Sequence, residues 1–406
     1  MVRENKYCLI GFAASVLIVL GVINSSPTSA QEPIKIGLLT DMSGFIVDYS
    51  GPGSVIAAKL AIEDYGGKVL GRPVVLLQGD HLNKPDVGVS MAREWYDGGV
   101  RAIFDVGITT VALGVQSLAK EKDRIVVFGS TGSPDITGSA CSPNGIAWTH
   151  NSYTQSLGAV RALAAENAKS WFFLTVDYTY GRHVQRDTTA MVNALGGRVL
   201  GAVAHPIDTR DFSSFLLQAQ ASQADVIGLA TTTAHAANII KQADEFGIRA
   251  GGQKLAPMSF SLHDVKGLGL ASAQGLLVTE AYYWDQNDET RAFAMKYKSK
   301  FGKMPNMVQA GMYGAVLHYL KAVDKAGTDD TAKVLAAMRA LPINDFMTKG
   351  GHIREDGRVM RDQYVFRVKS PSESKSEWDL YSFVERLPSD VAFPLAEAKT
   401  CPLVKG

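Results

Sequence analysis

The feature of this sequence that most constrains its fold is a repeated alternation of short apolar runs with longer segments of helical spacing. Apolar runs at residues 34–39, 74–77, 101–104 and 125–128 are each followed by such a segment. After His150 the alternation starts again, with runs at 171–176, 198–203, 225–229 and 275–279. Strands that alternate with helices indicate parallel sheets. The sequence therefore predicts two α/β units in one chain.

Helices are predicted from the spacing of apolar residues within these longer segments. The first begins beyond Gly51-Pro-Gly-Ser54 and stops at Gly66-Gly67. The second unit should contain helices at about 181–195, 213–222 and 234–247. Helices at 288–301, 307–325 and 330–340 have no strands between them, so we expect them to return to cover the first unit. Residues 352–387 predict a β-ribbon with a turn at Glu355-Asp-Gly357.

The N-terminus has the pattern of a secretory signal peptide. Arg3 and Lys6 precede an apolar stretch at residues 8–23, and the small residues Thr28 and Ala30 occupy the cleavage-recognition positions. The apolar stretch is short for a membrane span, so we favour a cleaved signal over a membrane anchor. We expect cleavage after Ala30 and a mature chain free in the periplasm.

The composition of the mature chain argues against several kinds of partner. Removing residues 1–30 takes away Arg3, Lys6 and Glu4, so that 41 basic and 40 acidic residues become 39 of each. A chain without net charge lacks the basic field that nucleic acid or an anionic membrane would need. The remaining length of about 376 residues favours two domains. We expect a monomer that binds no nucleic acid.

Two cysteines, Cys141 and Cys401, remain after processing. An even pair in an oxidising compartment predicts one disulfide that ties the C-terminal tail to the body of the protein. Two buried thiols or an intermolecular bridge are the alternatives.

The loops that follow the predicted strands are the candidate binding region, because doubly wound sheets bind ligands at the carboxyl ends of their strands. With two such units facing each other, the cleft between them becomes the natural pocket. The loops concerned are residues 40–53, 107–111, 129–135, 177–181, 231–235, 257–261 and 281–284.

Hydroxyl residues precede two predicted helices in these loops. Thr109 and Thr110 stand ahead of one, and Ser130 and Thr131 ahead of another. Hydroxyls beside a helix N-terminus, with its free N–H groups and favourable dipole, suit a carboxylate. Ordinary helix capping is the alternative for each residue.

Aromatic residues are the second feature of the same loops. They are Phe45, Tyr49, Tyr178, Tyr180, Phe260 and the run Tyr282-Tyr-Trp284. Such side chains can stack on a flat ligand while their polar tips orient it. Packing between the units and hinge support is the alternative, and we expect about half of them to serve it.

Sequence signatures of enzymes are absent. The chain has no Walker A loop, no His-Glu-x-x-His, no Cys-x-x-Cys and no Gly-x-Ser-x-Gly. Of the eight histidines, His150, His183 and His235 lie near candidate loops, but their spacing does not indicate metal ligation. We therefore expect no enzyme activity, no metal and no cofactor.

The order of several motifs resembles one known family. The motifs are Ile36-Gly-Leu-Leu-Thr-Asp-Met-Ser-Gly44, Phe128-Gly-Ser-Thr-Gly-Ser-Pro-Asp135, Asp177-Tyr-Thr-Tyr-Gly181, Asp211-Phe-Ser-Ser214 and Gly275-Leu-Leu-Val-Thr279. Together they resemble the periplasmic receptors of the leucine/isoleucine/valine-binding protein family, over nearly all of the mature chain to about residue 345.

The resemblance implies a type I periplasmic-binding fold, in which two doubly wound α/β lobes joined by three hinge crossings close around a ligand. Lobe 1 would hold residues 31–151 and the return at 283–345. Lobe 2 would hold residues 152–282, and residues 346–406 would form a C-terminal ribbon on lobe 2 and a tail. The implied function is that of a solute receptor for the membrane permease of an ABC importer.

The family pattern also bears on the ligand. Members that bind α-amino acids hold the carboxylate with first-lobe hydroxyls and N–H groups, and Thr109, Thr110, Ser130 and Thr131 match those positions. Such members hold the ammonium with a second-lobe acid, whereas residues 256–262 contain none.

Two further positions depart from the amino-acid receptors. Gly132 stands where those receptors have a threonine, and Thr232 where they have a tyrosine. Because a buried ammonium without an anionic partner is costly, we favour a small organic carboxylate, and an aromatic one. The motifs Asp41-Met-Ser-Gly44, Gly51-Pro-Gly53 and Ala61-Ile-Glu-Asp-Tyr-Gly-Gly67 also resemble the family branch that includes receptors for plant-derived aromatic acids.

Several alternatives stay open. Asp41, Asp105 or Asp177 could partner an ammonium, so a branched-chain amino acid or amide is the second candidate ligand. An exported hydrolase with Ser130 as nucleophile and His150 or His183 as base is a different class, as is a ligand subunit for a sensor kinase. The residues expected to contact the ligand are Phe45, Tyr49, Thr109, Thr110, Ser130, Thr131, Tyr178, Tyr180, Thr232, Met258, Ser259, Phe260 and Tyr283.

Overall fold

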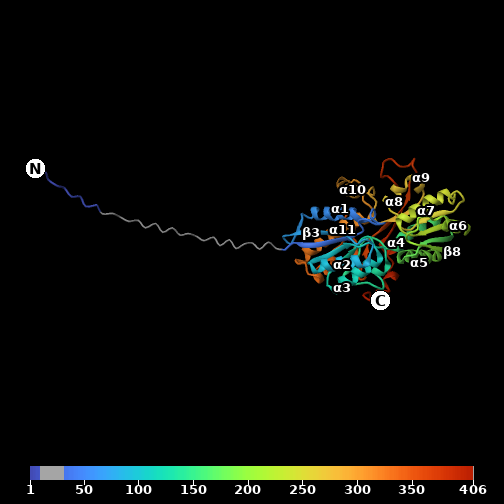
Figure 1. Ribbon diagram of the computed structural model, residues 1–406, viewed down its shortest axis with the longest axis horizontal. Helices are drawn as coiled ribbons and strands as arrows, with labels where there is room; N and C mark the ends of the chain where they lie inside the picture. The colour runs from blue at the N-terminus through green and yellow to red at the C-terminus, as the bar shows by residue number, and fades with distance from the viewer. Residues whose placement is uncertain (10–31, 406) are drawn as a thin grey trace. The chain divides into compact units, whose positions relative to one another are not determined.

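The computed structural model in Figure 1 describes residues 1–9 and 32–405. The predicted cleavage after Ala30 and most of the predicted signal peptide lie outside the described residues. The chain divides into two units, Met1–Glu32 and Pro33–Gly406. Residues 1–9 of the first unit form neither helix nor strand. Every helix and strand of the described residues belongs to the second unit.

The first α/β lobe is built on a sheet of order β2-β3-β1-β4-β5-β6. All its neighbouring strands pair parallel except β2 with β3. Apolar residues of β1 and β4 point alternately into two different cores, so both faces of the sheet are covered. The strands are β1 (Ile34–Thr40), β2 (Lys68–Val69), β3 (Arg72–Asp80), β4 (Val100–Asp105), β5 (Ile125–Phe128) and β6 (Gly145–Ala147). The helices between them are α1 (Gly51–Asp64), α2 (Pro85–Asp97), α3 (Thr109–Glu121) and the short 3-10 helix η1 (Pro134–Ile136).

The second lobe is built on a fully parallel sheet of order β10-β9-β7-β8. In Figure 1 its helices α5, α6 and α7 lie on the opposite side of the picture from α2 and α3. The strands are β7 (Ser170–Val176), β8 (Arg198–His205), β9 (Val226–Ala230) and β10 (Lys254–Pro257). The helices are α4 (Ser152–Ala165), α5 (Thr179–Ala194), α6 (Ser213–Ala221), α7 (Thr233–Glu245), α8 (Leu262–Leu268) and α9 (Leu270–Ala273).

The chain then returns to the first lobe through helices α10 (Asp288–Phe301), α11 (Met307–Ala326) and α12 (Thr331–Ala340). Helix α11 packs on α1 and on β4, and α12 packs on α11. These helices were expected to return to the first unit, and α11 lies against α1 and β4 of that unit.

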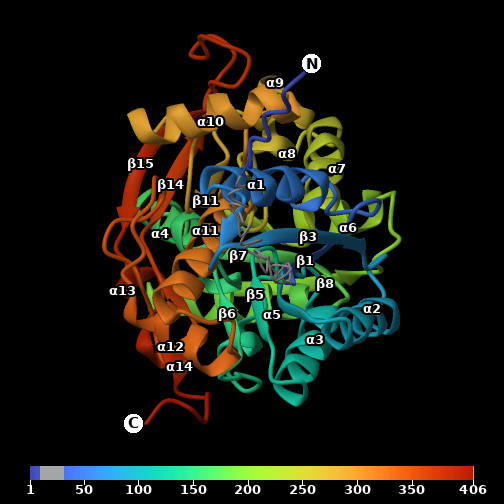
Figure 2. The same ribbon diagram turned by 90° about the vertical axis from the view of Figure 1, so that its left-hand side faces the viewer.

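A third, antiparallel sheet of order β11-β14-β15 completes the second lobe (Figure 2). Its strands are β11 (Leu277–Glu280), β14 (Gln363–Val368) and β15 (Tyr381–Leu387), and the short ribbon β12 (His352–Ile353) with β13 (Val359–Met360) precedes β14. The predicted β-ribbon is thus confirmed. The run at 275–279, however, pairs with the ribbon and not with the parallel strands that precede it. Two short helices, α13 (Ser389–Ala392) and α14 (Leu395–Ala398), end the chain.

A disulfide joins Cys141, in the loop after η1, to Cys401 in the C-terminal tail. The predicted pairing is confirmed. Because 260 residues separate the two cysteines, the bond closes most of the chain into one loop.

Across residues 1–9 and 32–405, none of the helices is both long and apolar enough to span a membrane.

Candidate functional site

A cavity of about 50 Å³ lies where loops of the two lobes meet at the carboxyl ends of their strands. Lobe 1 contributes loops that follow β1, β4, β5 and β6. Lobe 2 contributes the starts of α5 and α7 and the loop after β10. The lining residues are Phe45, Ile46, Tyr49, Gly107, Ile108, Thr109, Ser130, Gly132, His150, Tyr178, Tyr180, Thr232, Thr233 and Ser259. This is the location expected for a ligand of doubly wound sheets.

Three helices of the described chain begin at this cavity: α3, α5 and α7. Their first residues or N-caps, Thr109, Tyr178 and Thr232, line it. The N-caps of the three helices, Ile108, Tyr178 and Thr232, make no side-chain cap hydrogen bond, whereas Asn151 caps α4 and Asn306 caps α11. Other helices, such as α2 and α6, also lack such a cap, but their first turns do not line the cavity. Three positive dipole ends are thereby directed at one enclosed space.

The cavity wall itself carries no Asp, Glu, Lys or Arg among the described residues. Of the titratable groups in the described lining, His150 has the ordinary pKa that lies nearest to neutral pH. Burial, followed by the charge of Arg358, lowers its pKa to about 3. The histidine is therefore neutral at ordinary pH. Electrostatic attraction in the cavity comes from helix ends and hydroxyls and not from side-chain charge.

Ser130 is joined to a buried acid behind the wall. Its hydroxyl donates a hydrogen bond to Asp105, at the end of β4. Burial raises the pKa of Asp105, while hydroxyls, that of Ser130 first, oppose the rise. Because the proton of Ser130 is directed at Asp105, its oxygen offers an acceptor to the cavity.

The backbone that follows Asp105 is strained. Asp105 and Val106 have φ angles of 82° and 51°, and a β-branched residue such as valine rarely adopts a positive φ. The Val106 N–H donates to the carbonyl of Leu39, 2.9 Å away, which fixes the turn. The turn brings Gly107 to the cavity, where a Cβ atom would lie 2.5 Å from the Ile46 side chain and 2.9 Å from Ser130 Oγ. Strain of this kind concentrates at functional sites.

A chain of polar groups crosses the cavity between the lobes. The Tyr180 hydroxyl donates to Gln155 Oε1 at 2.5 Å, and the Gln155 amide lies 3.4 Å from the Tyr49 hydroxyl. The Tyr49 hydroxyl in turn lies 3.3 Å from His150 Nε2. The Nδ1 of His150 and the hydroxyl of Thr232 are buried and have no hydrogen-bond partner among the described residues. Both could be satisfied by a ligand.

Gly132 leaves space for this row of hydrogen-bonded side chains. A Cβ atom at this position would lie 2.8 Å from the Tyr180 ring and 3.4 Å from His150 Nε2. Any larger residue would push Tyr180 from its place.

The acids that could partner an ammonium differ in their availability. Asp41 is fully buried and accepts hydrogen bonds from the N–H groups of Ser43, Gly44 and Ile46, so it shapes its own loop. Asp177 is exposed and pairs with Arg182 at 2.5 Å. Asp41 and Asp105 both bond to residues of the cavity wall, Asp41 to the backbone of Ile46 and Asp105 to the hydroxyl of Ser130.

Eight of the thirteen predicted contact residues line the cavity. They are Phe45, Tyr49, Thr109, Ser130, Tyr178, Tyr180, Thr232 and Ser259. The backbone N–H of Thr110 lies 3.4 Å from the Tyr178 hydroxyl, which bridges the lobes beside the cavity. Contact of any of these residues with a ligand stays a prediction.

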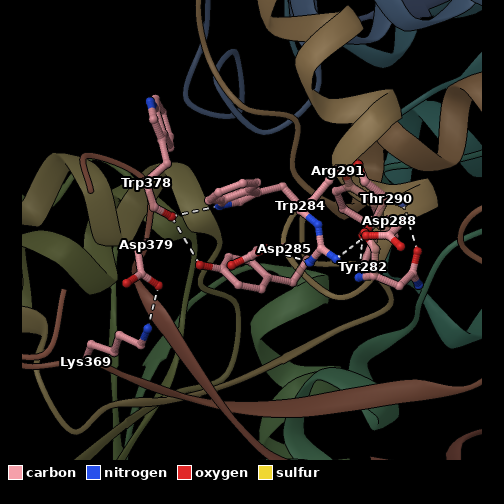
Figure 3. Close-up of polar contacts among 11 residues, drawn as sticks. Tyr282, Trp284, Asp285, Asp288, Thr290, Arg291, Lys369, Trp378 and Asp379 are labelled. Carbon is pink, nitrogen blue, oxygen red and sulfur yellow. Dashed lines mark hydrogen bonds and ion pairs between the residues drawn. The ribbon is translucent and has the colours of Figure 1, made fainter. Parts of the chain in front are cut away.

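Four predicted residues lie elsewhere. Met258 and Phe260 are packed in hydrophobic cores, and the Thr131 hydroxyl accepts from the Ser133 N–H at 3.5 Å. The Tyr283 hydroxyl donates to the Trp378 carbonyl at 3.2 Å, and the Trp284 indole does so at 2.8 Å. Figure 3 shows Trp284 directed at Trp378, in the loop that Lys369 and Asp379 close. The aromatic run at 282–284 therefore anchors the hinge to the ribbon.

Sequence reasoning did not select Ile46, Gly107, Ile108, Gly132, His150 or Thr233 as ligand contacts, although all six line the cavity. Five of them lie within loops that the strand pattern had marked, whereas His150 follows β6, a strand that the pattern had not marked. The apolar and glycine residues among them carry no chemical signal of their own, so only the strand ends could have pointed to those.

The arrangement does not match a hydrolytic triad. A serine nucleophile needs a base within hydrogen-bond reach, but the Ser130 hydroxyl donates to Asp105, and His150 contacts Tyr49. His183 pairs with Asp135 at 3.4 Å and does not line the cavity. Residues 1–9 and 32–405 contain no group of three or more side chains placed to hold a metal ion.

Comparisons with known proteins agree with this geometry. A family model described as "Periplasmic binding protein" matches residues 33–375. The curated Leu/Ile/Val-binding protein homolog 3 of Brucella melitensis biotype 1 is 23% identical over 320 residues, which cover 77% of this chain and 84% of the relative.

Two solved structures are also similar. One is described as a branched chain amino acid ABC transporter periplasmic ligand-binding protein from Burkholderia xenovorans LB400; it is 41% identical, covers 92% of this chain and 100% of its own, and has a TM-score of 0.83. The other is a solute binding protein of an ABC transporter from Rhodopseudomonas palustris BisB5 in complex with 3,4-dihydroxy benzoic acid. It is 23% identical, covers 89% of this chain and 99% of its own, and has a TM-score of 0.80, which shows a shared fold.

Proposed function

The chain belongs to the periplasmic binding protein family, and on that premise we propose that it is the solute receptor of an ABC importer for a small aromatic carboxylate. The resemblance predicted from the motifs is thus confirmed at the level of the family, as are the two α/β lobes of the type I fold. The proposal includes export, with cleavage after Ala30, and lobes bounded as the sequence predicts.

The observation that carries the ligand proposal is the convergence of α3, α5 and α7 on a cavity whose described lining has no charged side chain. Uncapped first turns offer N–H donors, and the dipoles favour a negative group. A carboxylate satisfies both. An ammonium would meet three positive dipole ends and no direct counter-charge.

The rest of the cavity suits an apolar, flat remainder. Phe45, Tyr49, Tyr178 and Tyr180 supply aromatic surface, and Ile46 and Ile108 add aliphatic surface. The volume of about 50 Å³ indicates a small ligand, since a single water needs roughly 10–15 Å³ on a comparable measure. The Ser130 oxygen and His150 Nδ1 could accept hydrogen bonds from a ring hydroxyl.

Closure around the ligand would give the importer its signal. The ligand shifts the open–closed equilibrium only by its differential affinity for the closed state. The Tyr178 hydroxyl of lobe 2, beside the Thr110 N–H of lobe 1, is a contact that only the closed state can make.

One observation favours a second candidate, an α-amino acid. The Ser130 oxygen is an acceptor backed by Asp105, and an ammonium could donate to it. The carboxylate would still meet the helix ends. In this second reading a positively charged ammonium lies against the Ser130 oxygen, whereas in the first reading an uncharged ring hydroxyl does.

The two readings are separated by a matched pair of ligands, phenylacetate and phenylglycine, which differ by the ammonium alone. We expect calorimetric titration of the mature protein to show phenylacetate binding at least about tenfold more tightly. Phenylacetamide, which lacks the charge, should bind more weakly than phenylacetate if the helix dipoles matter.

Tighter binding of phenylglycine would overturn the carboxylate reading in favour of the amino acid. A protein that binds cyclohexylacetate as well as phenylacetate would contradict the aromatic part alone. The importer role is tested in cells: deletion of the gene should abolish uptake of the radiolabelled ligand, whereas a receptor for a sensor kinase would leave uptake intact and remove a transcriptional response.

A further inference from the structure

A second cavity, of about 350 Å³, lies on the segment by which the chain crosses from α12 to the ribbon. Its walls are the loop at residues 346–352, residues 360–364 between β13 and β14, Asn287 before α10, and Arg386 on β15. It shares no lining residue with the cavity described above. The two cavities are therefore separate.

Arg361 is the group that sets the character of this second cavity. The residue is 2% exposed, and no carboxylate of the described residues lies within ion-pair distance of it. Within the part of the chain that the structure describes, its Nε and Nη2 atoms have no hydrogen-bond partner, and Nη1 meets only the sulfur of Met347, at 3.8 Å. Its guanidinium lies over the ring of Trp148, 5.3 Å from the centroid.

A guanidinium in this position is unusual because it remains charged. Burial lowers the pKa of Arg361 to about 10, against an opposing effect of Asp345, which leaves the group cationic at neutral pH. A buried charge without a partner is strongly destabilising. The planar fork of five N–H donors is also the side chain best suited to bind an oxyanion.

The surroundings of Arg361 point the same way. The Thr348 hydroxyl, in the same wall, is buried and has no hydrogen-bond partner among the described residues. The other cations of the wall are already engaged or exposed: Arg386 pairs with Asp362 at 2.6 Å, and Lys349 pairs with Glu289 at 2.6 Å. Asp362, the only carboxylate that residues 1–9 and 32–405 contribute to the wall, is thus neutralised by Arg386. The wall carries an excess of positive charge.

We propose that this cavity is a binding site for a small oxyanion, an inorganic phosphate or sulfate or the carboxylate of a small acid, held by Arg361 and Thr348. The oxyanion supplies the acceptors that the guanidinium and the hydroxyl lack. It also compensates the buried charge of Arg361, for which the described residues supply no ion pair.

The proposed oxyanion site lies next to residues 148–150, in the segment that joins β6 to α4 and carries His150. The Arg358 guanidinium donates to the His150 carbonyl at 3.0 Å, and the Gln363 amide donates to the Thr149 carbonyl at 3.2 Å. Together with Arg361 over Trp148, these residues hold positions 148–150 from the ribbon side. An oxyanion at Arg361 therefore stabilises the hinge.

The test is thermal unfolding of the mature protein in sodium phosphate, sodium sulfate or sodium acetate, each against sodium chloride at equal ionic strength. Because an anion that binds only the native state raises its stability, we expect a saturable rise in Tm with at least one oxyanion and not with chloride. The anion with the lowest half-saturating concentration identifies the source, inorganic or carboxylate.

Arg361→Met keeps the length of the side chain and removes its charge, so the rise should disappear. Arg93→Gln, an exposed arginine on α2 that pairs with Glu121, is the matched control and should respond like the wild type. If Arg361→Met does not fold, Thr348→Val decides, with an expected loss of at least about threefold in affinity for the anion. Gly132→Thr, which obstructs the first cavity, should retain the full response.

Three results would overturn the proposal: a rise as large with chloride as with every oxyanion, a full response in Arg361→Met, or loss of the response in Gly132→Thr. The last result would place the anion in the first cavity.

Discussion

The two cavities, as we propose them, attract negative groups by opposite means. The wall of the first holds no charged side chain among the described residues and relies on the ends of α3, α5 and α7. The second is dominated by the buried guanidinium of Arg361. A helix end costs little when its site is empty, because water can satisfy the N–H groups. A fixed buried charge is costly whenever its site is empty.

From this difference we infer which of the two sites can bind and release a solute reversibly. A receptor has to be stable both empty and filled, which dipoles and hydroxyls permit. A site built on an unpaired guanidinium favours permanent occupation and so suits a structural or regulatory anion.

Glu280 shows a third way to reduce the cost of burying an ionisable group. Its substitution should give the largest change in stability that we expect. This residue of β11 is 1% exposed and accepts from the Leu262 N–H at 3.1 Å and the Tyr381 hydroxyl at 2.9 Å. Burial, as the main cause, raises its pKa from 4.5 to about 8. Unlike Arg361, Glu280 can become neutral at ordinary pH.

A raised pKa means that the folded state holds the proton more tightly than the unfolded state. The contribution to stability is therefore complete below pH 4.5 and is lost as the pH rises toward about 8. Glu280→Gln keeps the acceptor and removes the titration, so its stability relative to wild type should rise by on the order of 4 kcal/mol between pH 5 and pH 8. Urea unfolding at both pH values measures it. The exposed Glu63→Gln is the control, and an equal pH dependence in wild type and Glu280→Gln would contradict the assignment.

The second largest effect concerns the room that Gly132 provides. A Cβ atom there would lie 2.8 Å from the Tyr180 ring, so Gly132→Thr should displace Tyr180 and lower the affinity for phenylacetate by roughly 100-fold, about 2.7 kcal/mol. Titration calorimetry measures the loss. Gly267→Ala, where a Cβ would meet nothing within 4 Å, is the matched control. If Gly132→Thr gained affinity for phenylglycine instead, the cavity would be that of an amino-acid receptor.

The sequence predicted the strand ends that form the first cavity, because apolar runs and helical spacing are local properties. The Cys141–Cys401 bond was also predictable, since no other cysteines remain after the predicted cleavage. These successes rest on periodicity and counting.

The errors of site selection have long-range causes. Tyr283 anchors the hinge because its hydroxyl bonds the carbonyl of Trp378, 95 positions away, which no local pattern reveals. The direction of the Ser130 proton depends on Asp105, 25 positions earlier and on the neighbouring strand. The run at 275–279 pairs with a ribbon strand that begins only at Gln363, so its place outside the parallel sheet could not be read from the alternation.

A third prediction examines Asp105, the acid that accepts a hydrogen bond from the Ser130 hydroxyl in the wall of the first cavity. Asp105→Asn retains an acceptor for the Ser130 hydroxyl and removes the buried negative charge. If the ligand is a carboxylate without an ammonium, the affinity for phenylacetate should rise by up to about tenfold, because a like charge has been removed. Calorimetry with phenylacetate and phenylglycine measures both directions at once. Asp177→Asn is the control, because Asp177 is exposed and pairs with Arg182. A tenfold loss of affinity for phenylglycine in Asp105→Asn, without such a loss in the control, would assign the ammonium to Asp105.

The smallest effect that we expect distinguishes the contribution of a hydroxyl to ligand affinity from that of the helix dipoles in the first cavity. The Thr232 hydroxyl is buried, lines the cavity and has no partner among the described residues, and it does not cap α7. Thr232→Val keeps the shape and should leave the empty protein as stable as wild type or slightly more so, because an unsatisfied group is removed. The affinity for phenylacetate should fall by roughly threefold to tenfold if the hydroxyl donates to the carboxylate. Thr149→Val is the matched control, since that hydroxyl is also buried and also has no partner among the described residues, but it does not line the cavity. An unchanged affinity in Thr232→Val would mean that the helix ends hold the carboxylate without this hydroxyl, which would widen the contrast between the two cavities.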